Sequence, residues 1–357
     1  MIDSVSFSSY EPRVSVFIPA YNAAATIGEA IRSVLDQSLT DFELLIVDDC
    51  STDDTLAVCH RFASDPRVRI ERMAVNSGRP AVRNAGLRLA RGEYLALLDA
   101  DDACQPERLM RQAAFLDRHP DIDVLGTRWQ GMDSDSRPLT ANRNVRPMSA
   151  DTVTCYLLFR GIIHNPTVMA RRAALAGYAY DRAFDIAEDY DLWARMIGRH
   201  RFALLPERLT RYRLHPSQAS SARKTESRQR RCDIQARELA RLGVDATRDE
   251  VIYHNLLYTG HGLFEAVTGQ SMNGVFARWA RDWLIRLCQA NRQTQRFPEP
   301  AFTRLAARLL YNVCRKAQRH DGLSVWTIYA RSPFKIALLG ARRDDTIQQV
   351  RSRLGGY

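Results

Sequence analysis

Three carboxylates follow one short apolar stretch of the chain. Residues Leu95–Leu98 have the length and composition of a buried strand, and Asp99, Asp101 and Asp102 come directly after it. Acids crowded at one strand end repel one another, so a cation or the hydroxyl groups of a ligand must compensate them. Asp99-Ala100-Asp101 is an Asp-x-Asp motif, which indicates one carboxylate on a divalent metal and the other on a sugar-nucleotide hydroxyl. The triplet alone also fits an acidic loop or a helix cap.

The elements around this motif alternate between strand and helix. Apolar and β-branched runs predict strands at Val14–Ile18, Phe42–Val47, Val68–Ile70 and Tyr94–Leu98, with helical patterns between and after them. This alternation with short connections is typical of a doubly wound parallel sheet, which binds ligands at the carboxyl ends of its strands. No Gly-x-Gly-x-x-Gly sequence follows any of these strands, which disfavours a dinucleotide-binding domain.

Farther along, the pattern becomes increasingly helical. We expect a helix over 106–118, a strand over 122–125, a polar loop over 130–150, a helix over 152–159, an edge strand entered from His164–Met169 and a helix beginning near Glu188. Two further strands are expected at 202–205 and 209–214, and residues from about 220 onward are expected to be helical almost to the end. The chain is therefore predicted to hold an α/β part followed by a helical extension.

Composition and charge limit the class of protein. The chain has 357 residues, 45% of them hydrophobic, enough for one large domain and an extension. Its seven cysteines form no Cys-x-x-Cys pair and follow no signal-peptide pattern, so we expect a reduced, cytoplasmic protein. No apolar run approaches the ~20 residues of a membrane span.

The charge is unevenly distributed along the chain. Residues 1–219 hold 27 Lys and Arg against 29 Asp and Glu, whereas residues 220–357 hold 24 against 12. The basic excess of residues 220–357 suits contact with an anionic membrane surface, nucleic acid or an acidic partner.

Six sequence blocks, taken in order over about residues 12–220, resemble the family 2 glycosyltransferases, which are inverting enzymes with the A-type glycosyltransferase fold. The blocks are Val16-Phe17-Ile18-Pro19-Ala20-Tyr21-Asn22, Val47-Asp48-Asp49-Cys50-Ser51-Thr52-Asp53, Gly78-Arg79-Pro80-Ala81-Val82-Arg83-Asn84, Asp99-Ala100-Asp101-Asp102, Glu188-Asp189-Tyr190-Asp191-Leu192-Trp193 and Tyr212-Arg213-Leu214-His215. The resemblance implies a catalytic domain over 1–219, with a nucleotide-sugar half at about 12–125 and an acceptor half at about 126–219. A basic helical extension over 220–357 lies outside it.

The resemblance implies a donor site at the strand ends. Tyr21 would stack on the nucleotide base, Asp49 would accept a hydrogen bond from it, and Arg83 would neutralise the diphosphate or the base region. Asp99 would contact the ribose, and Asp101 would bind the Mn²⁺ or Mg²⁺ that bridges the phosphates. The full nucleotide-sugar set is Pro19, Tyr21, Asn22, Asp49, Arg79, Arg83, Asp99 and Ala100. Without the family, Tyr21 fits a rim aromatic and Asp49 a helix cap.

The chemistry of an inverting transfer needs a base. A carboxylate must take the proton of the acceptor hydroxyl while cations stabilise the leaving diphosphate. By resemblance Asp189 is that base, with Glu188 beside it as the alternative. His215, after the last core strand, is a candidate metal ligand. The acceptor side is assigned to His164, Asp191 and Trp193.

The resemblance also implies an overall reaction. Processive members carry membrane spans and a Gln-x-x-Arg-Trp motif, whereas here Val275 stands where the Gln before Arg278-Trp279 should be. We therefore expect a non-processive hexosyltransferase that moves one sugar, most often from a UDP-sugar, to a glycan or lipid-linked glycan in cell-surface polysaccharide biosynthesis. The sugar, the acceptor and the oligomeric state stay open.

Two other classes of protein remain open as well. A nucleotidyltransferase also uses acid-bound Mg²⁺, but it would need a Gly-rich, Lys-bearing loop after the first strand, where Pro19–Asn22 stands. A basic nucleic-acid-binding protein would explain the C-terminal charge, but residues 1–219 contain no recognition module of that class. We therefore expect no nucleic-acid partner.

One stretch of the extension fits two environments. Its apolar side chains recur at helical spacing beside basic ones: Trp279, Trp283, Leu284 and Leu287 with Arg278, Arg281 and Arg286. This composition suits a helix lying in an anionic membrane interface, which would make the protein peripheral on the inner face of the cell membrane. The same stretch also suits the core of a helical bundle with an Arg-rich outer face.

Overall fold

The computed structural model describes residues 11–139, 148–215, 218 and 223–335. The chain forms two compact units that interleave along the sequence. The first unit comprises Met1–Ala141, Asn165–Arg182 and Glu207–Leu214, and the second comprises Asn142–His164, Ala183–Pro206 and His215–Tyr357. Part of the expected polar loop, residues 140–147, and both ends of the expected extension, residues 220–222 and 336–357, lie outside the described residues. The functional division at residue 219 stays a prediction.

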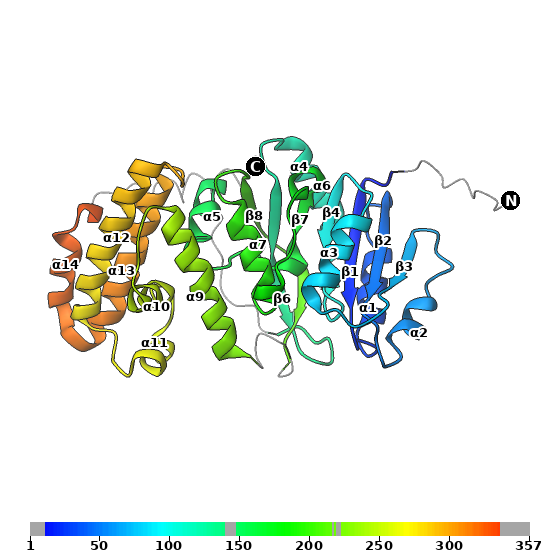
Figure 1. Cartoon of the computed structure of the whole chain (residues 1–357), viewed down its shortest axis with the longest axis horizontal. Helices are drawn as coiled ribbons and strands as arrows, with labels where there is room; N and C mark the ends of the chain where they lie inside the picture. The colour runs from blue at the N-terminus through cyan, green and yellow to red at the C-terminus, as the bar shows by residue number, and fades with distance from the viewer. Residues whose placement is uncertain (1–10, 140–147, 216–217, 219–222, 336–357) are drawn as a thin grey trace. The chain divides into compact units, whose positions relative to one another are not determined.

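An eight-stranded sheet forms the core of the first unit (Figure 1). Its strand order is β3-β2-β1-β4-β7-β6-β8-β5. The strands are β1 Val14–Ala20, β2 Phe42–Asp48, β3 Val68–Arg72, β4 Tyr94–Leu97, β5 Ala103–Cys104, β6 Val124–Met132, β7 Met169–Arg171 and β8 Phe202–Arg213. The pairs β1–β2, β1–β4 and β2–β3 are parallel, whereas β4–β7, β6–β7 and β5–β8 are antiparallel. The sheet is therefore mixed, and the expected α/β class is confirmed.

Four strands differ from the sequence-based expectation. Strand β5 was not expected, and β6 extends past the expected 122–125 to Met132. The segment 169–171, expected at an edge, forms β7 between β4 and β6, and its residues Met169 and Ala170 are fully buried. So short a strand does not show in its own sequence which strands it will pair with. The segment 202–213, expected as two strands, is the single strand β8. Pro206 does not interrupt it, because the fixed φ of proline suits an extended backbone.

Helices accompany the parallel strands of the first unit. They are α1 Ile27–Leu35, α2 Thr55–His60, α3 Arg79–Leu89, α4 Arg108–Arg118 and α6 Arg172–Leu175. The apolar residues of α1 recur at helical spacing, and Ile27, Ile31 and Val34 are fully buried. Helix α3 approaches β1 closely at Gly86, where an added Cβ would lie 2.5 Å from the ring of Phe17. Because β1 is parallel to β2 and β4, the loops that follow these strands lie at one edge of the sheet.

The second unit is largely helical, as expected for the region after residue 220. Its helices are α5 Ala150–Tyr156, α7 Glu188–Met196, α9 Lys224–Arg241, α10 Arg248–Leu256, α11 His261–Thr268, α12 Gly274–Thr294, α13 Ala301–Asp321 and α14 Trp326–Ala330. Local sequence sets several of their starts. Thr247 and Glu250 form a capping box at α10, and the Asn273 side chain accepts two backbone hydrogen bonds at α12.

The apolar stripe of α12 packs inside the second unit. Trp283 is 3% exposed, and Leu284 and Leu287 are fully buried. The Nε1 of Trp283 donates a hydrogen bond to Nδ1 of His254 at 3.1 Å, and its ring stacks on that of Trp279. The stripe is therefore bundle core, and its interpretation as a membrane-interface surface is wrong. Among the described residues, no helix combines the length and apolarity needed to cross a bilayer.

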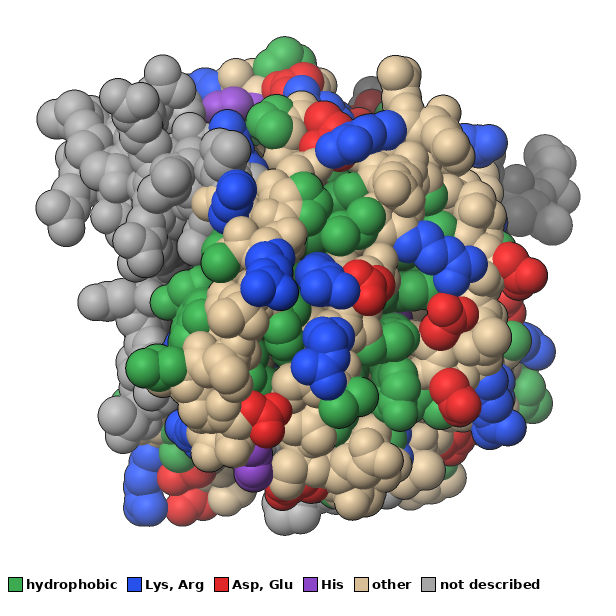
Figure 2. All heavy atoms as spheres, turned by 90° about the vertical axis from the view of Figure 1, so that its left-hand side faces the viewer, with side chains coloured by type: hydrophobic (Ala, Val, Ile, Leu, Met, Phe, Trp, Pro, Cys, Tyr) green, Lys and Arg blue, Asp and Glu red, His purple; other side chains and the backbone are tan. Residues whose placement is uncertain are grey.

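The outer surface of these helices carries mixed charge. Figure 2 shows Lys and Arg side chains among hydrophobic and acidic ones, on the side where Figure 1 places α12 to α14. Arg281 pairs with Asp282 at 2.8 Å, and Arg286 pairs with Glu250 at 3.0 Å. Part of the basic excess is thus compensated locally.

Candidate functional site

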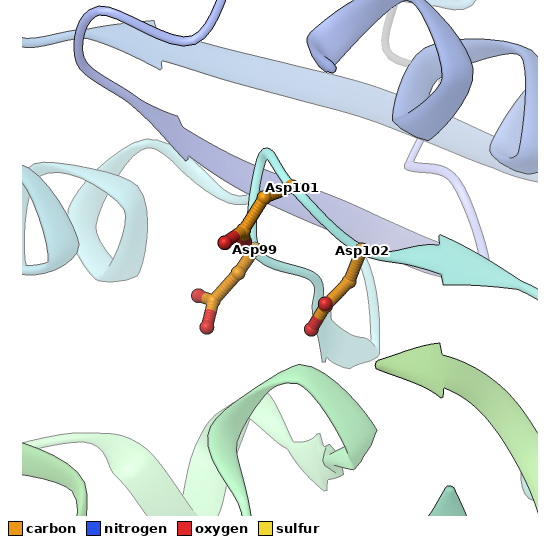
Figure 3. A group of neighbouring side chains, drawn as sticks. All are labelled: Asp99, Asp101 and Asp102. Atoms are coloured by element: carbon orange, nitrogen blue, oxygen red, sulfur yellow. The ribbon is translucent and has the colours of Figure 1, made fainter. Parts of the chain in front are cut away.

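The three aspartates after β4 converge on one point (Figure 3). One carboxylate oxygen from each of Asp99, Asp101 and Asp102 lies within 4.8 Å of the other two. The loop between β4 and β5 carries all three, with Asp99 and Asp101 half-buried and Asp102 buried. The structure therefore brings together the two acids of the Asp-x-Asp motif and adds the third.

Asp102 is a buried acid that is only partly compensated. Its Oδ1 accepts a hydrogen bond from the backbone N–H of Arg213 at 2.8 Å, whereas its buried Oδ2 has no hydrogen-bond partner among the described residues. Burial raises the pKa of Asp102 well above its ordinary value, and the carboxylates of Asp101 and Asp99 raise it further. A cation at this point would supply the missing partner and reduce the repulsion between the acids.

These residues fit a divalent metal ion. Carboxylate oxygens are the protein ligands that Mg²⁺ and Mn²⁺ prefer, and the partnerless Oδ2 of Asp102 is available for such a bond. His215 belongs to the second unit and is not a member of the aspartate cluster that the described residues form. Its expected place on the metal stays a prediction.

Arg213, the last residue of β8, holds the loop between β4 and β5 that carries the three aspartates, here called the acid loop. Its Nε donates to the backbone oxygen of Asp101 at 2.8 Å, and its Nη2 pairs with Glu29 Oε2 at 2.6 Å. Although burial raises the pKa of Glu29, hydrogen bonds from Ser136 and Arg213 outweigh that effect and lower it. No role for Arg213 was predicted from the sequence beyond its place in a matching block. Its partners lie 112 and 184 residues away, so no local pattern could have indicated this role.

Arg83 of α3 is buried against the same loop. Its Nη2 pairs with Asp99 Oδ1 at 3.0 Å, and its guanidinium lies 5.7 Å from the ring centroid of Tyr180. Asn84 fixes Tyr180 by donating from Nδ2 to its backbone oxygen at 2.9 Å and accepting from its backbone N–H at 2.7 Å. Two residues of the expected donor set, Arg83 and Asp99, are therefore in contact. Tyr180 was not indicated by the sequence, since it lies 96 residues from Asn84.

Asn22 fixes the loop after β1. Its backbone N–H donates to Ser51 Oγ at 3.0 Å, and its Oδ1 accepts from the backbone N–H of Thr52 at 2.9 Å. Its φ of 47° lies in the left-handed region, which asparagine tolerates better than most residues. Tyr21 beside it is 49% exposed, so its ring is open to a planar ligand.

Asp49 shapes the loop that leads into α3. It is buried, and its two oxygens accept hydrogen bonds from the backbone N–H groups of Ser77 and Gly78, each at 2.8 Å. The next residue, Arg79, is exposed at the start of α3. Because a carboxylate can accept more than two hydrogen bonds, the expected contact of Asp49 with a nucleotide base stays a prediction.

A fully buried cation, Arg108, fixes the end of β4. Its Nη2 donates to the backbone oxygens of Leu97 at 2.8 Å and Val168 at 3.1 Å, and its Nε donates to Gln112 Oε1 at 2.9 Å. Its described contacts include no carboxylate. Leu97 is the last residue of β4, so Arg108 anchors the point from which the acid loop departs. The sequence did not indicate this role either.

In the second unit, Glu188 and Asp189 open helix α7. Acids in a first helical turn are favoured by the helix dipole. Glu188 is 4% exposed, whereas Asp189 is half-buried and accepts a hydrogen bond from the backbone N–H of Tyr190 at 2.7 Å. Asp189 therefore presents more surface than its neighbour, which favours it over Glu188 as the group that meets an acceptor.

The expected acceptor-side residues differ in burial. Asp191 and Trp193 are fully buried, and Asp191 pairs with Arg195 and Arg237. In this conformation both residues pack α7 and present no surface to an acceptor. His164 is half-buried, and its expected role stays a prediction.

Comparison with known proteins finds related sequences. The sequence model described as Glycosyl transferase family 2 matches residues 15–175. An uncharacterized glycosyltransferase of Haemophilus influenzae is 30% identical over 219 residues, which cover 59% of this chain and 68% of that protein. The putative teichuronic acid biosynthesis glycosyltransferase TuaG of Bacillus subtilis is 40% identical over 110 residues, which cover 30% of this chain and 44% of that protein.

Two solved structures share the fold. Residues 1–349 of Staphylococcus aureus TarS, in complex with UDP-GlcNAc, align with a TM-score of 0.54 and 21% identity over 89% of this chain and 92% of that one. The mannosyltransferase PcManGT of Pyrobaculum calidifontis, in complex with GDP-Man and Mn²⁺, aligns with a TM-score of 0.51 and 18% identity over 92% and 86%. At these identities the likeness supports the fold alone.

Proposed function

Because the chain belongs to glycosyltransferase family 2, we propose that it transfers one sugar, with inversion, from a nucleotide sugar to a glycan or lipid-linked glycan of a cell-surface polysaccharide. The observation that carries this proposal is the convergence of Asp99, Asp101 and Asp102 after β4, where one buried carboxylate oxygen has no partner in the described part of the chain. Membership of the family disfavours both the nucleotidyltransferase and the nucleic-acid-binding alternatives.

The donor occupies the first unit in this proposal. A UDP-sugar is the first choice because the TarS complex holds UDP-GlcNAc, and a GDP-sugar is the alternative because the PcManGT complex holds GDP-Man. The exposed ring of Tyr21 suits stacking on the base. Arg83 and Arg79 supply positive charge for the diphosphate, and Asp99, already bonded to Arg83, binds the ribose hydroxyls.

Asp101 holds a divalent cation, Mn²⁺ or Mg²⁺, with Asp102 as its buried neighbour. When bound, the cation neutralises the charge that develops on the leaving diphosphate. Arg213 keeps the two aspartates in place through its bonds to Asp101 and Asp102. His215 is retained as a candidate ligand on the basis of the resemblance.

Asp189 acts as the general base, with Glu188 as the alternative. The acceptor oxygen forms a bond to the anomeric carbon, and the bond from that carbon to the diphosphate oxygen breaks with its electron pair. The acceptor proton passes to the carboxylate of the base. The half-buried position of Asp189 at the first turn of α7 supports this choice.

Contact with an anionic membrane is a separate part of the proposal. With the Trp283 stripe buried, it rests on charge alone, namely the 24 basic against 12 acidic residues in 220–357. Such contact would hold a cytoplasmic enzyme near a lipid-linked acceptor. Salt-sensitive co-sedimentation with anionic vesicles supports this part, and equal recovery with neutral vesicles refutes it.

A donor screen tests the function. Melting temperature is measured with UDP-GlcNAc, other UDP-sugars and GDP-mannose, each with MnCl₂ and with EDTA. A ligand at 100 times its dissociation constant adds about 2.7 kcal/mol of stability, so one nucleotide class should raise the midpoint only when metal is present. Release of the matching nucleoside diphosphate then checks turnover. No shift and no release with any nucleotide sugar contradicts the proposal.

A further inference from the structure

Helix α7 is held by a charge network around two buried carboxylates. The network is formed by Asp191 and Arg195 of α7, Arg237, Glu238 and Arg241 of α9, and Arg296. Asp191 Oδ1 accepts from Arg237 Nη1 at 2.6 Å, and its Oδ2 accepts from Arg195 Nε at 2.9 Å. The side chain of Asp191 has no exposed surface. Each oxygen of its carboxylate therefore bonds to one of these two guanidinium groups.

Glu238 of α9 is the second buried carboxylate of the network. Glu238 Oε1 accepts from Arg237 Nε at 3.1 Å and from Arg241 Nη1 at 2.9 Å, and its Oε2 accepts from Arg296 Nη2 at 2.6 Å. The Glu238 side chain is also fully buried. Arg237 thus bonds to both buried carboxylates at once, one on each helix.

Helices α7 and α9 are in contact and run side by side in Figure 1. Asp191 of the first turn of α7 bonds to Arg237 of α9. The Gln235 side chain lies near the hydroxyl of Tyr190 and donates to the backbone oxygen of Phe159 at 2.7 Å. Arg231 interacts electrostatically with Asp189. Successive residues of this turn therefore face side chains of α9.

We propose that Arg237 is a positioning residue, which fixes the rotation of α7 and thereby the direction in which the Glu188–Asp189 pair is presented. This inference rests on the proposed function, in which that pair supplies the general base. By this inference α9 contributes to catalysis by positioning the candidate base, although α9 lies outside the stretch that resembles the family. A base displaced by about 1 Å can cost roughly 100-fold in rate.

A purely structural role predicts something different. If the network only adds stability, losing Arg237 should lower the melting temperature and leave the turnover of folded molecules unchanged. A positioning role predicts a lower kcat at temperatures where the variant is fully folded, with donor affinity unchanged because the donor residues lie in the first unit.

The test compares Arg237→Met, Arg237→Lys and Arg230→Met in the full chain. Arg230 is the matched control, since it lies on the same helix and makes one solvent-exposed pair, with Asp233 at 3.8 Å. Nucleoside diphosphate release is measured from UDP-GlcNAc or GDP-mannose with MnCl₂, whichever the donor screen selects, and donor affinity is measured by calorimetry. We expect kcat to fall roughly 10- to 100-fold in Arg237→Met, to recover in part in Arg237→Lys, and to stay unchanged in Arg230→Met.

Unchanged kcat in folded Arg237→Met overturns the inference. If that variant does not fold, Asp191→Asn replaces it, because the amide keeps the size of the side chain while weakening both ion pairs. Asp189→Asn and Glu188→Gln in the same assay separate the two levels of the argument. If neither lowers kcat, the proposed base is wrong; if one of them does and the Arg237 variants do not, only the positioning role is wrong.

Discussion

The two units hold their candidate site residues in different ways. In the first unit, the three aspartates lie within a few residues of the end of β4, on the loop that this strand delivers. In the second unit, the first turn of α7 is fixed by Arg237, which lies 46 residues from Asp191, and Glu238 of the same network bonds to Arg296, 58 residues away. Local sequence therefore specifies the candidate metal and donor residues, whereas in our proposal long-range ion pairs orient the candidate base.

This contrast predicts that variants of the two units fail in different ways, and Asp101→Ala should have the largest effect. Without Asp101 the cluster loses a metal ligand, so metal-dependent turnover should fall by roughly 1,000-fold or more, in line with loss of several kcal/mol of charge stabilisation. The turnover is measured as the release of nucleoside diphosphate in the presence of MnCl₂. Undiminished turnover of the unaltered chain in excess EDTA contradicts the role given to the metal.

The second-unit counterpart is Asp189→Asn, which should lower kcat by about 10²- to 10⁴-fold. Donor affinity should stay within twofold, because the amide removes only the proton acceptor. Steady-state kinetics and calorimetry separate the two quantities. If Glu188→Gln shows this signature and Asp189→Asn does not, the roles of the two acids are exchanged.

The sequence predicted local features of both units better than the contacts between distant segments, for physical reasons. Strand ends and the acids beside them are local features, so the segments that form β1 to β4 and the convergence at Asp99 and Asp101 followed from short patterns. Pairing between distant segments is not local. The place of β7 inside the sheet and the role of Arg213 both depend on partners far along the chain.

The stripe of α12 illustrates the same limit. Helical spacing showed that Trp283 and Leu287 share one face, but it did not show what covers that face. The structure supplies the answer in His254, which accepts a hydrogen bond from Trp283 and lies on α10. The burial of α7 residues Asp191 and Trp193 was likewise not visible from the motif that contains them.

A smaller effect is expected from Arg213→Met, which tests the long-range support of the first unit. Loss of the side-chain bond to the backbone oxygen of Asp101 should weaken Mn²⁺ binding by roughly 10- to 100-fold, the usual range when a residue that orients metal ligands is removed, whereas the backbone N–H that bonds to Asp102 is kept. Arg211→Met is the matched control, since Arg211 also pairs with Glu29, at 3.3 Å, and makes no described side-chain bond to the acid loop. Equal Mn²⁺ affinity in both variants, measured by calorimetry, contradicts this role.

The smallest expected effect is a pH dependence confined to the second unit. Burial lowers the pKa of His254 from 6.5 to about 4 in the folded chain. Between these values the unfolded chain binds a proton that the folded chain does not, so the free energy of unfolding should fall as the pH decreases from about 6.5 to 4. His254→Gln, which can still donate to Leu158 and accept from Trp283, should show a flatter curve in urea titrations. Identical slopes contradict the assignment.

The comparison between the units is tested most directly by calorimetric titration of UDP or GDP, as the donor screen selects, into the unaltered chain, Asp101→Ala and Asp189→Asn. Each titration is done with MnCl₂ and with EDTA. We predict that the unaltered chain and Asp189→Asn bind the nucleotide with similar affinity in MnCl₂ and much more weakly in EDTA, and that Asp101→Ala binds weakly in both. Equal binding of the unaltered chain in MnCl₂ and EDTA, or a loss of binding in Asp189→Asn as large as in Asp101→Ala, would contradict the division of roles between the two units.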